Sequence, residues 1–136
     1  MRNKKYPVMT ILFLIAAIWN LIGAGFGYFN TDYTFQLLFN RELADPLCHA
    51  IYQGAWGTTL TYFIGYLIVA YDPVKHSGVV LVGGIGKIAF ALKLIQYYLA
   101  GWAQPVILTI VAGDLIFGIF FIYYFYHLYV NKEKII

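Results

Sequence analysis

Long apolar stretches alternate with short polar links through most of the sequence. A helix needs about 20 predominantly apolar residues to cross a hydrocarbon core that is roughly 30 Å thick. Four stretches reach or approach that length, so the pattern predicts four transmembrane helices, over residues 7–29, 50–71, 77–99 and 103–130. The third of these is the hardest to recognise from hydropathy, because it carries two lysines.

The longest link, residues 30–49, contains a shorter apolar pattern. Thr31 and Asp32 can cap a helix there, and Asp45 followed by Pro46 would end it. Its apolar side chains recur at helical spacing: Phe35, Leu38, Phe39 and Leu43. We expect this short helix to lie in the membrane interface or to fold over the mouth of the bundle. It is therefore either a plain connector or a lid over a ligand site.

Composition agrees with a membrane protein. The chain is 62% apolar, 20% aromatic and 11% charged, whereas about a quarter of the residues are charged in soluble domains. We expect residues 1–136 to form a single domain. The predicted fold class is all-α, an integral membrane four-helix bundle with the lipid bilayer as its main partner and no nucleic-acid partner.

The positive charges are distributed unequally between the two sides of such a bundle. The link 30–49 carries Arg41 alone. The side that holds both termini and the 72–76 turn carries six: Arg2, Lys4, Lys5, Lys75, Lys132 and Lys134. Because cytoplasmic segments are enriched in Lys and Arg, we expect both termini to be cytoplasmic and residues 30–49 to face outward from the inner (plasma) membrane.

Two ionisable residues interrupt the third and fourth spans. Gly101 marks the turn between these two spans. Lys87 lies 14 residues before Gly101, and Asp114 lies 13 residues after it. In two antiparallel helices they would differ in depth by roughly one helical rise of about 1.5 Å. Since each charge alone costs about 2.5–3.5 kcal/mol at the centre of a span, the sequence predicts a buried pair. That pair either serves a function or fixes the register of the two helices.

Three further polar residues join this pair as candidate ligand-binding or proton-binding groups: Asn20, Thr58 and Thr61. Asn20 is equally suited to a simple hydrogen bond between helices. Small residues recur along the second span at helical spacing, which predicts a packing face: Gly54, Thr58, Thr61 and Gly65. Gly23 and Gly27 form a similar small pair on the first span.

The sequence also excludes several kinds of chemistry. Cys48 is the single cysteine and Ser77 the single serine, so no intrachain disulfide and no serine–histidine–acid triad can form. His76 and His127 could in principle ligate haem from adjacent helices. Both, however, fall at helix ends beside basic and tyrosine-rich sequence, where histidine is an ordinary interfacial residue. We therefore predict no cofactor, no metal site and no catalytic residue.

Two short motifs carry a family resemblance: Gly86-Lys87 and Gly113-Asp114-Leu115-Ile116-Phe117. With these motifs, its size and its four-span layout, the chain resembles the small uncharacterised four-helix membrane proteins of bacteria that are similar to DoxX-like families. The resemblance implies a bundle in the bacterial inner membrane with an accessory or small-ligand role. It assigns no catalytic residue.

Together these features favour a non-enzymatic membrane protein that binds a small amphiphile between its helices, around Lys87 and Asp114. Aromatic walls and a few central polar groups are the composition expected of a mostly apolar pocket. One alternative is a proton-coupled transporter or membrane-embedded enzyme in which Asp114 changes protonation. Another is an accessory subunit of a larger membrane complex or a homo-oligomer, suggested by aromatic side chains that face outward.

Overall fold

The computed structural model describes residues 6–130, and this part of the chain is all-helical apart from short links. Five helices follow one another: α1 (Pro7–Phe29), α2 (Thr31–Phe39), α3 (Pro46–Tyr71), α4 (Ser77–Leu99) and α5 (Ile107–Tyr129). Three of them, α1, α4 and α5, are long and apolar enough to cross a membrane. The expectation that 77–99 is the least apolar span is therefore wrong. α3 is the longest helix, but its threonines and glycines lower its hydropathy.

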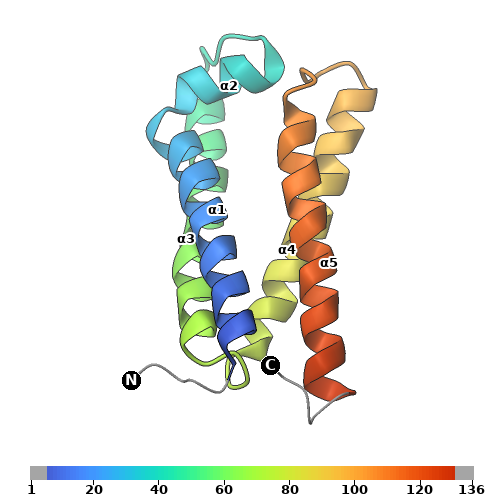
Figure 1. Cartoon of the computed structure of the whole chain (residues 1–136). Coiled ribbons are helices and arrows are strands. Elements are labelled where there is room, and N and C mark those ends of the chain that lie inside the picture. Colours follow the sequence, from blue (N-terminus) through green and yellow to red (C-terminus); the bar gives the residue numbers. More distant parts are fainter. Residues whose placement is uncertain (1–5, 131–136) are drawn as a thin grey trace.

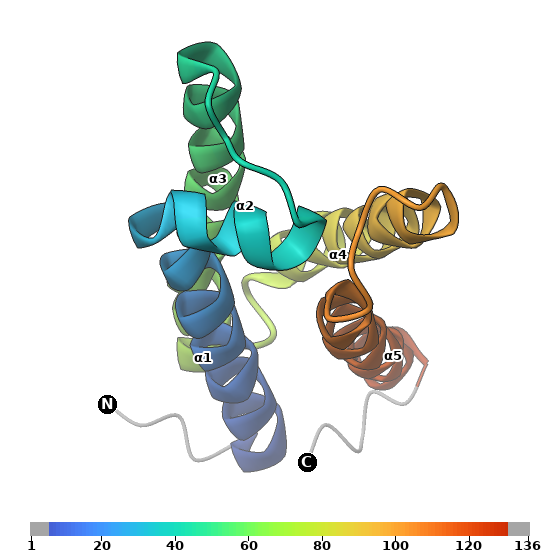
Figure 2. The same ribbon diagram turned by 90° about the horizontal axis from the view of Figure 1, so that it is seen from above.

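The four long helices form two antiparallel pairs, α1 with α3 and α4 with α5 (Figure 1). The pairs lie close together near the 72–76 turn, where α1 begins and α5 ends. Toward the opposite end they diverge, and the short helix α2 lies across that end (Figure 2). The molecule is therefore a V of two helical hairpins and not an evenly packed four-helix bundle.

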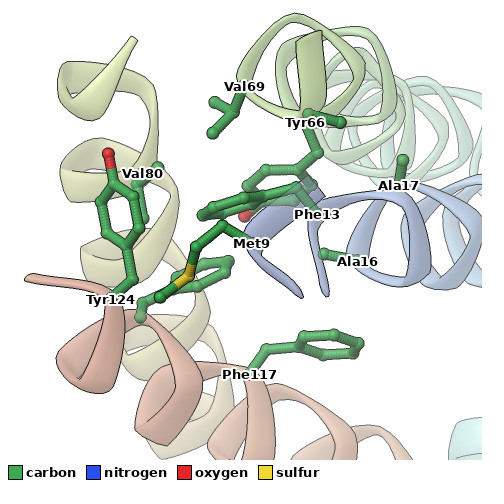
Figure 3. Packing of buried hydrophobic residues seen from close by; sticks show 11 residues of the cluster. Met9, Phe13, Ala16, Ala17, Tyr66, Val69, Val80, Phe117 and Tyr124 are labelled. Carbon is green, nitrogen blue, oxygen red and sulfur yellow. The ribbon is translucent and has the colours of Figure 1, made fainter. Parts of the chain in front are cut away.

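An aromatic core closes the narrow end of the V (Figure 3). The centroid of the Phe13 ring on α1 lies 5.6 Å from the ring centroid of Phe121 and 5.2 Å from that of Tyr124, both on α5. The Tyr124 hydroxyl donates a hydrogen bond to the carbonyl of Pro73 in the turn between the hairpins. Buried residues of all four long helices take part: Met9, Phe13, Ala16, Ala17, Tyr66, Val69, Ala70, Val80, Phe117, Phe121 and Tyr124.

A second, smaller core lies toward the open end and includes α2. Leu38 of α2 is buried there with Trp56 of α3 and Ile107 of α5. The backbone N–H of Gln104, in the link between α4 and α5, donates to the carbonyl of Leu38 at 2.7 Å. α2 thus begins beside the α1–α3 hairpin and reaches the α4–α5 hairpin, as seen from above in Figure 2.

The predicted short helix exists, but its ends differ from those expected. Asn30 is its N-cap, without a side-chain hydrogen bond, in place of Thr31 and Asp32. It ends at Phe39, because Asn40 adopts the left-handed conformation with φ 51°, which asparagine tolerates better than most residues.

Asp45 and Pro46 start α3 and do not end α2. The Asp45 carboxylate accepts a hydrogen bond of 2.8 Å from the Cys48 N–H, and Pro46 occupies the first turn, where a missing N–H costs nothing. α3 therefore begins before the predicted residue 50. At the other end of the chain, α5 begins at Ile107 and not at residue 103, because residues 100–106 form the link around Gly101.

Small residues pack differently on α4 and α3. On α4, Gly83, Gly84 and Ala91 are buried together with Lys87. On α3 the expected packing face is wrong, since Gly54, Thr58 and Thr61 are exposed. α3 instead buries Trp56, Tyr66, Val69 and Ala70; the Trp56 ring packs against Gly27 of α1 and the Tyr66 ring against Gly83 of α4.

Candidate functional site

The predicted pair of charges is formed. Lys87 Nζ lies 2.7 Å from Asp114 Oδ1, and each side chain is only 7% exposed. The tight turn around Gly101, whose φ is +73°, allows α4 and α5 to return alongside each other. The predicted contact between the two charges is thereby confirmed. Lys87 lies near the middle of α4, and Asp114 lies in the first half of α5.

α1 supplies two more groups to the pair. The Lys87 ammonium also donates to Asn20 Oδ1 at 2.9 Å, and the Asn20 amide donates to the Thr59 carbonyl at 3.0 Å. The indole N–H of Trp19 donates to Asp114 Oδ1 at 3.3 Å. Asn20 was predicted as a site residue, whereas Trp19 was not. These hydrogen bonds compensate part of the cost of burying the two charges.

A small residue beside the pair explains how Trp19 reaches it. A Cβ atom on Gly113 would lie 2.0 Å from the Trp19 ring, so only glycine leaves space for the indole next to Asp114. The glycine before the aspartate was visible in the sequence, but nothing in it identified the partner that fills the space. We refer below to Trp19, Asn20, Lys87 and Asp114 as the polar cluster.

Two aromatic rings from the narrow-end core lie beside the ammonium. Lys87 Nζ is 5.3 Å from the centroid of the Phe117 ring and 5.9 Å from that of Tyr66. Such distances permit a cation–π attraction. Tyr66 comes this close because Gly83 has no side chain, since a Cβ there would lie 2.6 Å from the Tyr66 hydroxyl.

The polar cluster borders two cavities on opposite sides of the V. One, of about 220 Å³, involves all five helices and has Thr34, Leu37 and Leu38 of α2 in its wall. The other, of about 290 Å³, lies between α3 and α4. Their walls share five residues: Asn20, Thr59, Lys87, Phe90 and Asp114. We name them the α2 cavity and the α3–α4 cavity; Asn20, Lys87 and Asp114 of the polar cluster line both.

The two predicted threonines do not join the hydrogen bonds of this cluster. Thr58 lines the α3–α4 cavity, but its hydroxyl donates to the Gly54 carbonyl of its own helix at 3.1 Å. Thr61 is exposed and donates to the Thr58 carbonyl at 2.6 Å. Thr59, which was not predicted, holds Asn20 through its backbone carbonyl. A shift of one residue turns a side chain by about 100° around a helix, and that rotation was not visible in the sequence.

The histidines and acidic residues form no evident metal or haem site in the described part of the chain. Across residues 6–130, no group of three or more His, Cys, Asp and Glu side chains is arranged to hold a metal ion. The ring centroid of His127 lies 4.2 Å from that of Tyr123 and 5.5 Å from that of Tyr126. His76 is the N-cap of α4. That these histidines bind no haem, and that the chain takes no cofactor, stays a prediction.

Comparison with known proteins adds nothing to this site. No family model, curated protein or solved structure matches the chain. A function for the polar cluster therefore has to be inferred from its own geometry.

Proposed function

We propose that this chain is a four-span protein of the bacterial inner membrane that binds a small amphiphile beside the polar cluster. Three helices suited to crossing a membrane support a membrane location. α3 packs antiparallel along α1, and its 26 residues extend about 39 Å at 1.5 Å per residue. If α1 crosses the bilayer, α3 has to cross beside it.

The orientation follows from the same arrangement. α1 begins and α5 ends at the narrow end of the V, next to the 72–76 turn (Figure 1). Because Lys and Arg are concentrated in the sequence at that end, it is the cytoplasmic end by the positive-inside rule. α2 then lies at the outer interface.

One observation carries the ligand-binding proposal: a buried polar cluster lies in the wall of an otherwise apolar cavity. Ligand sites are typically apolar, with a few polar groups that set the orientation of the ligand. A cluster that served stability alone is often replaced by apolar residues without loss. The aromatic walls of Trp56, Phe90 and Phe26 suit an acyl or isoprenoid chain.

The position of α2 supports the same proposal. Thr34, Leu37 and Leu38 of α2 line the α2 cavity, and α2 is tied to the α4–α5 link by the Gln104–Leu38 hydrogen bond. Of the two roles considered for this helix, connector or lid, these contacts favour the lid.

Native mass spectrometry of gently extracted protein tests the proposal. We expect a discrete bound amphiphile in the natural protein and its loss in Lys87→Met. Lys93→Met is the matched control, because Lys93 lies on the same helix but is exposed and donates to Gln96. Bulk phospholipid alone, with the same profile in all three proteins, would contradict the proposal.

The runner-up function is proton-coupled transport through Asp114. It is favoured by one observation, that Asp114 and Lys87 line two different cavities. Transport or binding should then depend on pH in the natural protein and lose that dependence in Asp114→Asn. The same pH response in both proteins would exclude this mechanism.

A further inference from the structure

We infer that the amphiphile carries an uncharged hydroxyl headgroup on a single apolar chain. This inference rests on the proposed function and adds the chemical class of the ligand. Its basis is the hydrogen-bonding capacity that the polar cluster leaves unused at the cavity wall.

Asp114 leaves one acceptor available. Its Oδ1 accepts from both Lys87 and Trp19, and within residues 6–130 no donor contacts Oδ2. In that part of the chain, His127 Nδ1 is the single fully enclosed side-chain atom without a hydrogen-bond partner. Oδ2 is therefore not fully enclosed, and Asp114 borders both cavities.

Lys87 leaves one donor available. An ammonium has three N–H groups, and two of them are given to Asp114 and Asn20. The Lys87–Asp114 pair thus has one N–H and one carboxylate oxygen without a hydrogen-bond partner within residues 6–130, and both residues line the α2 cavity. A hydroxyl group both donates and accepts and satisfies both. An ether or ester oxygen only accepts, which would leave the carboxylate oxygen without a partner in an apolar cavity.

The charge of the cluster excludes ionised headgroups. Lys87 and Asp114 together are neutral, and the rest of the α2 cavity holds no further charged side chain. A carboxylate or phosphate that approached Lys87 would also lie beside the negative charge of Asp114, which repels it. An amine that approached Asp114 would lie beside the positive charge of Lys87, which repels it. Either would bring an unbalanced charge into a low-dielectric site, which is strongly unfavourable.

The size of the cavity favours one chain. At about 220 Å³ it is smaller than the roughly 300–1,000 Å³ typical of pockets for drug-sized ligands. Apart from the cluster and three threonines, the wall is apolar and includes Trp56, Phe90 and Leu38. A cavity of this size favours a single acyl or isoprenoid chain over the two chains of a phospholipid.

Tryptophan quenching by a matched series of brominated chains tests the inference. Trp19 and Trp56 line the α2 cavity, and Trp102 is exposed outside it, so the full chain carries Trp102→Phe. The probes share an 11-bromoundecyl chain and end in an alcohol, a methyl ether, a carboxylate or an amine. We expect the alcohol to bind about tenfold more tightly than the other probes. A tenfold ratio of dissociation constants corresponds to the loss of one hydrogen bond to a charged group.

Asp114→Asn provides the conservative variant. The amide keeps hydrogen-bonding groups but leaves the cluster with a net positive charge, so the preference should shift from the alcohol to the carboxylate probe. Tightest binding of the carboxylate or the amine to the natural sequence would overturn the inference.

Two glycine substitutions separate failure of the inference from failure of the proposed function. Gly23 lines the α2 cavity, and neither Gly23 nor Gly78, which lies outside it, has an atom within 4 Å of an added Cβ. Gly23→Leu should fill the cavity and abolish quenching, whereas Gly78→Leu should not. Equal binding of all four probes, lost in Gly23→Leu, would leave the proposed function standing and overturn the hydroxyl inference. Quenching that Gly23→Leu does not change would overturn both.

Discussion

Lys87 and Asp114 show how the cost of burying a charge shapes its surroundings. Neither residue can remain unpaired in the apolar interior, and the structure gives each an opposite charge and a polar partner from α1. Asn20 holds the ammonium, Trp19 the carboxylate, and the Thr59 carbonyl fixes Asn20 in turn. Three helices therefore meet at two charges, although only the two charged residues were predicted to touch.

The pair should behave as partners in a double-mutant cycle. Lys87→Met and Asp114→Leu each leave one ionisable group without its partner, so each should lower the free energy of unfolding in detergent by about 1–3 kcal/mol. The double variant removes the need for pairing and should recover most of that loss. If it is as unstable as the sum of the two single variants, the residues do not stabilise each other.

Two glycines one helical turn apart on α1 should differ sharply on substitution. A Cβ on Gly27 would lie 2.2 Å from the buried Trp56 ring, whereas one on Gly23 meets nothing within 4 Å. Gly27→Ala should therefore destabilise by about 1–3 kcal/mol through overpacking. Gly23→Ala should be neutral or stabilise by up to about 1 kcal/mol. Thermal unfolding of both variants checks this, and equal effects would contradict the close contact of α1 with α3.

At the start of α3, Asp45 caps the helix that follows it and does not end the helix that precedes it. Asp45 and Pro46 suit the end of one helix and the beginning of the next equally well in the sequence. In the structure α2 has already ended at Asn40, and Asp45 caps α3. α2 is left as a nine-residue segment, too short to be stable alone, so its position depends on contacts with both hairpins.

The cap at Asp45 should make the start of α3 sensitive to pH. The hydrogen bond from the Cys48 backbone N–H holds the pKa of the Asp45 carboxyl below its usual range. Its stabilisation is therefore fully present above the unfolded-state pKa of about 3.9 and is lost as the pH falls through the lower folded-state value.

Asp45→Ala should lose this stabilisation at neutral pH, and Asp45→Asn should keep most of it, because asparagine is also a good N-cap. Thermal unfolding of the three proteins at pH 7 and pH 3 measures the effect. The difference between the natural protein and Asp45→Ala should shrink at pH 3. A difference that stays constant with pH would show that the charged cap does not contribute.

In the molecule as a whole, the two hairpins share a core at the narrow end and separate toward α2. The second core, near α2, is smaller, and the α2 cavity borders it at Ala24, Leu38 and Trp56. A tightly packed four-helix bundle would have placed the polar cluster in a solid core. The divergence of the hairpins therefore gives the cluster access to cavities on two sides.

The proposed topology can be tested with the single cysteine. Cys48 is exposed and lies in the first turn of α3, which follows α2 in the chain, so a membrane-impermeant maleimide should label it in intact spheroplasts. In a Cys48→Ser background, Lys75→Cys in the opposite turn should be labelled only after permeabilisation. The reverse pattern would place the termini outside and contradict the four-span, both-termini-inside arrangement.

The helices and the depth of the charges could be derived from the sequence because both depend on local chain geometry. Apolar length predicts the long helices, and counting residues from the turn at Gly101 places Lys87 and Asp114 at similar depth once the two spans are taken as antiparallel neighbours. The helical segment within 30–49 follows from periodicity in the same way. These properties depend on the order of segments along the chain and not on how the helices rotate against each other.

Side-chain partners and cavities depended on how the helices rotate and diverge when they pack. The small residues of α3 were expected to face another helix, yet the close fit of Trp56 over Gly27 turns the bulky side of α3 inward and leaves Thr58 and Thr61 exposed. Trp19 reaches Asp114 only because Gly113, distant in sequence, leaves space for its ring. Such fits join residues that are far apart in the sequence, so no local pattern contains them, and they alone place the polar cluster against open space.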